Sequence, residues 1–276
     1  AIPFFLLAGA FLKLSGAAGK LVQFAASLVG HYRGGLAQTT LLTGVLFSGA
    51  SGSSVANAAF AAATFHPELV RHGYPPARAG ALVAASSVLD NVIPPSIAFL
   101  ILATATNLSV GALLVGGLFA GLLMAVCLAV AIRLAMGTAS GAAPASAEMR
   151  RRAGIAALPA FGLGLIVVFG IRLGIVTTTE AAGLAALYTL ILAATSRRSG
   201  SSIVAAFRQS AAEAAAIGLL IGAAAPVAFL LAIDDIAGLV RHLAGLFGGS
   251  AVAVLLLANV ILLIAGLVMD IGAAIL

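Results

Sequence analysis

The chain has 276 residues, of which 62% are hydrophobic and only 8% are charged. Soluble domains carry about 25% charged residues, so this composition excludes a globular enzyme and indicates a polytopic, all-α membrane protein in a lipid bilayer. The net charge of +6 comes from basic residues scattered among apolar segments. That pattern favours loop charges that set membrane topology over nucleic-acid binding. The single cysteine, Cys127, provides neither a disulfide framework nor a cysteine metal site.

The beginning of the chain predicts a membrane span followed by a helix on the membrane surface. The chain starts without Met and is apolar at both ends, so we expect a fragment truncated at both ends. Residues 1–12 predict the end of a span. Residues 20–32 have apolar positions at helical spacing and a basic rim. This pattern is typical of a helix that lies in the membrane interface.

Residues 36–64 predict a hairpin of two half-helices that enters the membrane and returns. Its middle, GVLFSGASGSSVAN over 44–57, combines glycines with four serines. Glycine weakens a helix interior, and serine offers other partners to the freed backbone groups. Inside a membrane, non-helical backbone is tolerated where it is buried in protein or lines a wet cavity. We therefore predict a binding site at this tip; the alternative is a helix-packing face built from small residues.

Residues 77–105 predict a second interrupted segment, with Asp90, Asn91, Pro94, Pro95 and Ser96 at its middle. Consecutive prolines remove two amide donors and displace the preceding residue from helical geometry. A carboxylate at membrane depth is costly and marks a candidate functional site. The alternative is a proline kink with a satisfied Asp.

The remaining chain predicts plain spans joined by polar segments. A loop is expected over 65–76. Small residues of the span at 109–135, Gly116, Gly117 and Gly121, are expected to pack against other helices. The other expected elements are a polar linker at 137–152, spans at 154–171 and 178–196, an amphipathic lead-in at 203–214 to a span reaching Ile233, a second surface helix at 234–248, and an apolar segment from Ala251 that is interrupted from Gly266 to Asp270. We expect Thr178, Thr179 and Glu180 to cap the start of their helix.

Threading these elements through a membrane separates the charges. Twelve basic residues fall on one side and only two, Arg172 and Arg241, on the other. This asymmetry predicts that the first side is cytoplasmic. It also supports the hairpin, because a single crossing at 36–64 would mix the charges on the two sides.

The same threading predicts an inverted repeat. A surface helix precedes a glycine-rich broken segment twice, on opposite sides, with Gly49 and Gly266 about 217 residues apart. Inverted repeats with broken helices are typical of secondary transporters. The predicted organisation is a first repeat at 1–136, a cytoplasmic linker at 137–152 and an incomplete second repeat at 153–276.

Four motifs in order resemble the large membrane subunit of tripartite ATP-independent periplasmic (TRAP) transporters. They are FSGASGSSVA at 47–56, VIPPSIAFLI at 92–101, GIVTTTEAAGLAALY at 174–188 and GLVMDIGAAIL at 266–276. The resemblance implies an elevator-type fold and sodium-coupled import of organic acid anions, such as dicarboxylates or sialic acid. It also implies a periplasmic substrate-binding protein, a small four-helix membrane subunit and the bacterial inner membrane. Asp90-Asn91 departs from the Gly-Pro pair that often precedes IPPS in this family.

The predicted chemistry is coordination without catalysis, and no cofactor beyond sodium as the coupling ion is expected. Serine hydroxyls and unwound carbonyls offer oxygen ligands to sodium, and half-helix N-termini attract an anionic substrate. No Lys or Arg is expected at membrane depth near the tips. The candidate binding residues are Ser48, Gly49, Ser51, Gly52, Ser53, Ser54, Asn57, Ser87, Asp90, Asn91, Pro94, Pro95, Ser96, Gly266 and Asp270. Among them, Ser51, Ser53, Ser54 and Asp270 are the candidate sodium ligands.

Three other functions are compatible with a broken-helix membrane protein. An intramembrane enzyme would need a nucleophile and base pair or a metal cluster, which Asp90 and the serines do not supply. The four histidines are expected in loops or surface helices, without a metal role. A channel is disfavoured by the predicted inverted hairpins. A sodium-coupled anion transporter that works alone stays open.

Overall fold

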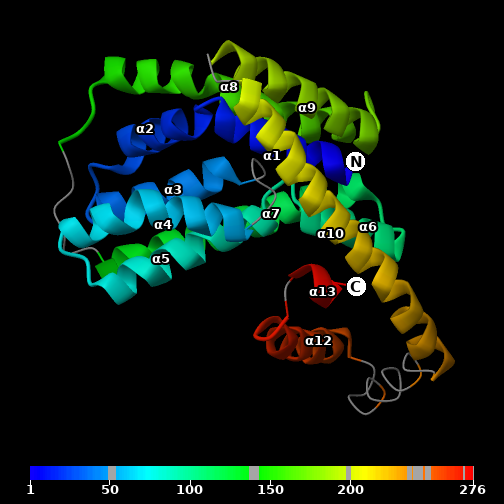
Figure 1. Cartoon of the computed structure of the whole chain (residues 1–276). Coiled ribbons are helices and arrows are strands. Elements are labelled where there is room, and N and C mark those ends of the chain that lie inside the picture. The colour runs from blue at the N-terminus through cyan, green and yellow to red at the C-terminus, as the bar shows by residue number, and fades with distance from the viewer. Residues whose placement is uncertain are drawn as a thin grey trace.

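The computed structural model describes residues 1–48, 54–136, 143–196, 200–234, 250–269 and 271–275, together with Gly238 and Gly245. Within these residues every regular element is helical, as predicted (Figure 1). Four helices are long and apolar enough to cross a membrane: Val110–Ala135, Ala147–Arg172, Thr178–Thr195 and Ser202–Val227. A fifth span is possible if the bent pair α1 and α2 counts as one.

The chain opens with two helices set at an angle. Helix α1 (Ile2–Leu14) and helix α2 (Ala17–Val29) meet at a bend of 71° around Gly16, which adopts a positive φ. A bend of this size is expected where a span turns into a helix along the membrane surface. Helix α1 packs against α9 and α10, whereas α2 packs against α3 and α8.

The predicted hairpin consists of α3 (Gly35–Phe47) and α4 (Ser54–Arg71), and α4 returns alongside α3 (Figure 1). Ser48 ends α3 with a non-helical ψ of 139°. The expectation of a loop over 65–76 is wrong for its first half, because α4 continues through Pro67 to Arg71. Phe65 and Leu69, one turn apart, are buried in a core cluster with α3 and α5, and this packing offsets the cost of the internal proline.

Helix α5 (Pro76–Val88), a short 3₁₀ turn η1 (Leu89–Asn91) and helix α6 (Ile97–Thr106) form the second interrupted segment, as predicted. Helix α7 (Val110–Met136) packs closely against it. A Cβ at Gly117 would lie 2.7 Å from the Val92 carbonyl oxygen, and one at Gly121 would collide with Cγ1 of Ile93. These two glycines therefore pack as expected, whereas Gly116 faces no neighbour within 4 Å.

Helix α8 (Ala147–Arg172) begins inside the predicted linker. The Ser146 hydroxyl accepts a hydrogen bond from the Met149 amide at 3.1 Å, and Glu148 pairs with Arg152 one turn later. An N-cap and an i,i+4 ion pair stabilise a helix start, which explains why 147–152 is helical. The preceding residues 137–142 lie outside the described part of the chain.

Helix α9 (Thr178–Thr195) starts where the sequence predicted, but the cap is Thr177. Its hydroxyl accepts from the Glu180 amide, and the Glu180 carboxylate accepts from the Thr177 amide at 2.7 Å. Glu180 thus closes a reciprocal capping box, whereas Thr178 and Thr179 are the first helical residues. Helix α10 (Gly200–Ile233) is one continuous helix, so the predicted lead-in at 203–214 is simply its first part.

The last described elements are α12 (Ala251–Gly266) and α13 (Ile271–Ile275), so this segment is interrupted after Gly266 as predicted. Helix α13 packs against α6 and α10. Most of the predicted surface helix at 234–248 lies outside the described residues. The inverted repeat and the cytoplasmic assignment remain predictions.

Candidate functional site

Buried polar side chains gather around the two interrupted segments. Helices α3 and α4 both pack against α5 and η1, so the ends of four elements meet there. In a chain with so few polar residues this clustering is distinctive. The buried members are Thr43, Ser48, Asn57, Ser86, Ser87, Asp90 and Ser96. We call these seven residues the polar cluster.

The contact between α3 and α5 depends on Gly44. A Cβ at this position would lie 2.9 Å from the Ser86 carbonyl oxygen and 3.4 Å from the Ser86 Cβ. Real Cβ atoms almost never approach a backbone oxygen so closely. Glycine therefore lets the backbones of the two helices approach closely, next to Thr43 on α3 and at Ser86 on α5.

Some hydroxyls of the polar cluster are satisfied by the local backbone. Ser48 Oγ donates to the Gly44 carbonyl at 2.7 Å, and Ser87 Oγ donates to the Val83 carbonyl at 2.8 Å. Ser96 Oγ spans the second break and donates to the Asn91 carbonyl at 2.5 Å. These bonds stabilise helix ends and use only the hydrogen of each hydroxyl, so the oxygen lone pairs can still ligate a cation.

Three other buried atoms of the polar cluster have no hydrogen-bond partner within the described part of the chain. They are Thr43 Oγ1, Asn57 Nδ2 and Ser86 Oγ. Buried polar groups are nearly always hydrogen-bonded, and an unsatisfied one costs about 1–3 kcal/mol. Helices α3, α4 and α5 each contribute one such atom. The three atoms together can therefore bind a polar ligand.

Asp90 in η1 is fully buried at the second break. It takes part in a further interaction, so it is not an isolated charge. The ammonium group of Lys13, near the end of α1, feels the charges of both Asp90 and Glu213 of α10. The expectation that no basic residue lies at membrane depth near the tips stays a prediction.

The second break owes its shape to its prolines. Pro94 and Pro95 are buried and are joined by a cis peptide bond, and α6 resumes at Ile97. Neither proline carries an amide hydrogen, so a helix through this point would lose two consecutive hydrogen bonds, which favours a break. Asn91 is half-buried at the end of η1.

Several predicted residues cannot be compared with the polar cluster. Ser54 is the first residue of α4, but its side chain lies outside the described part. Gly266 is exposed at the end of α12, and the structure brings the following helix α13 against α6. Gly49, Ser51, Gly52, Ser53 and Asp270 lie outside the described residues.

Sequence reasoning missed Thr43 and Ser86. The signal for Ser86 was its position beside Ser87 in an apolar helix, and Thr43 directly precedes Gly44. Neither signal separates an unpartnered hydroxyl from one bonded to its own helix. Across the described residues no three His, Cys, Asp or Glu side chains are grouped as a metal site would require.

Comparison with known proteins points to one family. The profile of the family described as "Tripartite ATP-independent periplasmic transporter, DctM component" matches residues 1–276. The chain is 36% identical over 195 residues to the C4-dicarboxylate TRAP transporter large permease protein DctM of Pseudomonas aeruginosa, which covers 70% of this chain and 46% of the relative. It is 29% identical over 274 residues to the 2,3-diketo-L-gulonate TRAP transporter large permease protein YiaN of Escherichia coli, which covers 98% of this chain and 64% of the relative.

A third relative is an uncharacterized protein, y4mL, of Sinorhizobium fredii, 33% identical over 286 residues. That alignment covers all of this chain and 67% of the relative. The chain thus spans between about half and two thirds of the length of these curated relatives.

Proposed function

Because the chain belongs to the DctM component family of tripartite ATP-independent periplasmic transporters, we propose that it translocates organic acid anions with sodium. Members of this family are multi-pass membrane transporters and not enzymes. We further propose that the substrate is delivered by a periplasmic binding protein and that a small four-helix membrane subunit accompanies this chain in the bacterial inner membrane. The tripartite family description supports both partners.

The observation that carries this proposal is the polar cluster with its three unpartnered atoms. Thr43 Oγ1 and Ser86 Oγ are hydroxyl oxygens, which are suitable ligands for sodium. Asn57 Nδ2 is a donor and suits a carboxylate oxygen. A sodium ion on the two hydroxyl oxygens and an anionic substrate on the Asn57 amide would together satisfy all three atoms.

Charge supports the same assignment. Asp90 adds a carboxylate to the buried end of the site, and Lys13 partly offsets it. A buried carboxylate favours a cation nearby and disfavours an anion that arrives alone. Binding of sodium before or with the substrate would remove this repulsion, which is a physical basis for coupling.

The remaining predicted residues complete the proposed site. Ser51, Ser53 and Ser54 would supply further oxygen ligands at the first tip. Gly266 and Asp270 would do so at the second tip. We propose that the two tips are related by the inverted repeat and move together in an elevator-type mechanism.

The relatives indicate the class of substrate. Two of them are named for C4-dicarboxylate and 2,3-diketo-L-gulonate. Both ligands are organic acid anions, so we propose a carboxylate-bearing substrate, a dicarboxylate or a sialic-acid-like sugar acid.

Uptake into proteoliposomes tests the proposal. The full-length permease, with its small subunit and binding protein, should take up labelled dicarboxylate only with an inward sodium gradient. Ser51→Ala, Ser53→Ala or Ser54→Ala should raise the half-saturating sodium concentration roughly ten- to hundredfold, the effect of losing one buried ligand. Thr106→Ala, at an exposed hydroxyl bonded within α6, serves as the control.

Two results would change the assignment. Wild-type sodium dependence in all three serine variants, at normal expression, would identify the first tip as a packing face. Robust uptake of free organic acid without the binding protein would indicate a transporter that works alone.

A further inference from the structure

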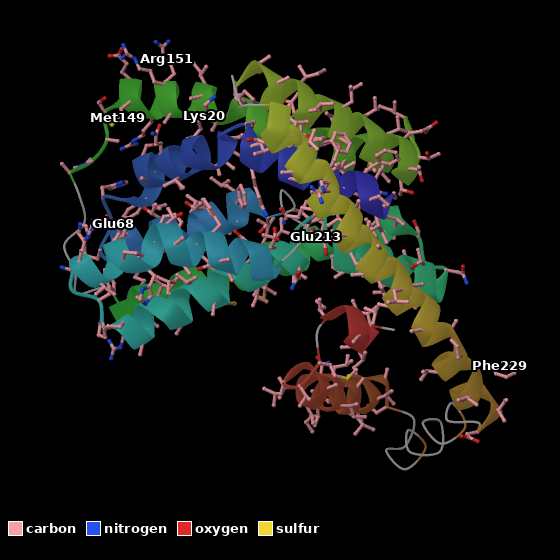
Figure 2. All side chains as sticks on the ribbon, viewed as in Figure 1. Lys20, Glu68, Met149, Arg151, Glu213 and Phe229 are labelled. Atoms are coloured by element: carbon pink, nitrogen blue, oxygen red, sulfur yellow. The ribbon has the colours of Figure 1, made fainter. Side chains whose placement is uncertain are left out.

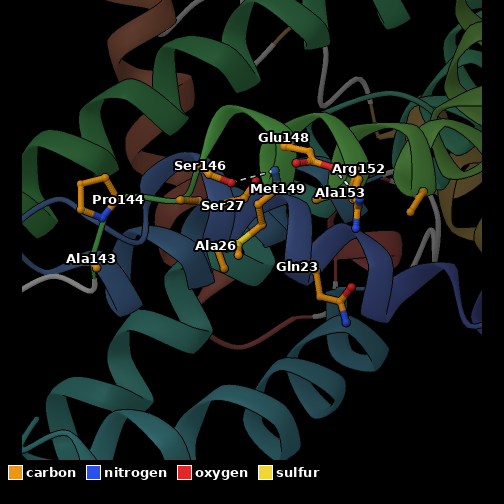
Figure 3. A pocket seen from close by; sticks show the side chains of 12 residues that line it. Gln23, Ala26, Ser27, Ala143, Pro144, Ser146, Glu148, Met149, Arg152 and Ala153 are labelled. Carbon is orange, nitrogen blue, oxygen red and sulfur yellow. Dashed lines mark hydrogen bonds and ion pairs between the residues drawn. The ribbon is translucent and has the colours of Figure 1, made fainter.

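A separate groove lies between α2 and the first turns of α8, on the face of α2 that α3 leaves uncovered (Figure 3). Its volume is about 1010 Å³, comparable with that of a small-molecule site. Small and apolar side chains form much of its lining, among them Ala26 from α2 and Met149, Ala153 and Ala156 from α8. These side chains offer no hydrogen bonds, so the lining is suited to hydrocarbon.

The rim of the groove is basic. Arg152 lines it directly, and Arg150 and Arg151 precede it on α8. Lys20, on α2, lies at the same end of the molecule as Met149 and Arg151 (Figure 2). Four basic residues thus outnumber the single carboxylate of Glu148 in this region, and of the four Arg152 lines the groove itself.

The basic side chains retain unused hydrogen-bond donors. Arg152 Nη2 pairs with Glu148 Oε1, but a guanidinium has five N–H donors. Arg150 Nε is buried and has no hydrogen-bond partner within the described residues. A ligand with several acceptor oxygens, such as a phosphate group, would satisfy these donors.

The groove lies at the N-terminal end of a helix that is long and apolar enough to cross a membrane. Helix α8 qualifies as a span from Ala147 onward, so its first turns mark the end of the apolar layer. Charged residues lie above this boundary and apolar residues below it. A phospholipid has the same division, with a charged headgroup above its acyl chains.

We propose that the groove between α2 and α8 binds one anionic membrane phospholipid. The phosphate contacts Arg152 at the rim, the neighbouring charges of Arg150, Arg151 and Lys20 add positive potential, and an acyl chain lies over Ala26, Met149 and Ala153. The surplus of positive charge selects an anionic headgroup over a zwitterionic one. The bound lipid joins α2 to α8 and thereby stabilises the bend at which α2 leaves α1. This inference does not depend on what the permease transports.

Thermal unfolding of the purified full-length permease with its small subunit tests the proposal. Added phosphatidylglycerol should raise the unfolding midpoint in a saturable manner, whereas phosphatidylcholine and soluble glycerol phosphate should not. Arg152→Gln should raise the phosphatidylglycerol concentration for half-maximal stabilisation about fivefold, the effect of removing one cation near a lipid surface. Ala153→Phe, which fills the groove, should abolish stabilisation by the lipid.

Two matched controls separate the groove from general effects. Arg71→Gln removes an equally exposed arginine that also pairs with a glutamate, Glu68, and should leave the lipid response unchanged. Ala131→Phe adds a ring on the exposed face of α7 and should also leave the lipid response unchanged.

The outcomes are distinguishable. Equal stabilisation by phosphatidylcholine, or an equal effect of Arg71→Gln and Arg152→Gln, would overturn the proposal. Full stabilisation by glycerol phosphate would show an anion site and would likewise overturn it. An absent lipid response in the assembled complex, together with crosslinks that place the small subunit or a second copy of the chain in the groove, would also overturn the proposal.

Discussion

Replacing Thr43 by valine removes one buried hydroxyl and keeps the shape of the side chain. Because Thr43 Oγ1 has no hydrogen-bond partner in the described residues, the unliganded protein should gain about 1–3 kcal/mol of stability. At about 2–4 °C per kcal/mol, the unfolding midpoint should rise by several degrees. If the hydroxyl ligates sodium or substrate, the same change should raise the half-saturating ligand concentration roughly ten- to hundredfold. Thermal unfolding and proteoliposome uptake measure the two effects on one preparation.

Thr40 provides the matched control. It is buried one turn earlier on α3, but its hydroxyl donates to the Leu36 carbonyl at 3.0 Å. Thr40→Val therefore loses a made hydrogen bond, and its stability should fall by about 0.5–1.5 kcal/mol with transport unchanged. If Thr43→Val is destabilised like Thr40→Val and transports normally, the unpartnered hydroxyl has a structural role and the reasoning about the polar cluster is refuted.

Three further changes have defined expectations. Cysteines at Ala143 and Gly248 should react with an impermeant thiol reagent from opposite faces of the membrane; labelling from one face contradicts the inverted repeat. Gly44→Val should cost about 1–3 kcal/mol in thermal stability, since the new side chain collides with a carbonyl of α5; an unchanged midpoint would show that α3 and α5 do not touch there. Lys13→Met and Asp90→Asn should change thermal stability non-additively, by more than about 0.5 kcal/mol from the sum of the single effects, since the charge of Asp90 acts on Lys13. Additive changes in the double variant would show that the two charges are not coupled.

The interrupted segments were predictable because glycine and proline act through the local backbone. Pro94 and Pro95 have no amide hydrogen to donate, whatever surrounds them. The serines and glycines after Phe47 likewise weaken any helix through that stretch. The end of α3 and the break before α6 follow directly from these properties.

Helix boundaries set by tertiary packing were less predictable. Pro67 suggests a helix end, yet α4 continues because Phe65 and Leu69 bury their side chains against α5. The start of α8 inside a polar linker depends on the Ser146 cap and on an ion pair within its first turns. In both places residues that disfavour a helix locally are outweighed by contacts that form only in the folded helix. These contacts are therefore not visible in the sequence.

The composition of the site was partly predictable, but its chemistry was not. Ser48, Ser87, Asn57, Asp90 and Ser96 were identified as polar residues in apolar surroundings, and all five are buried in the polar cluster. Which hydroxyls are already bonded depends on side-chain rotamers and neighbouring carbonyls, and these are properties of the folded chain. The charge of Asp90 acts on Lys13, which the sequence analysis placed among the charges on one side of the membrane.

The three unpartnered atoms constrain what the polar cluster is for. At about 1–3 kcal/mol each, they cost a large share of the 5–15 kcal/mol by which folded proteins are typically stable. Such a cost persists where the surrounding packing maintains the atoms in place and a ligand satisfies them during function. Ligand binding should then stabilise the folded protein, by RT ln(1 + [L]/Kd) for one site. Hydroxyl oxygens can ligate a cation while the amide donates to an anion, so both ligands can occupy the cluster together. Sodium and an anionic substrate bound side by side attract each other, so stabilisation by the two together should exceed the sum of their separate effects. Under the proposed function, this excess free energy would couple the two in transport.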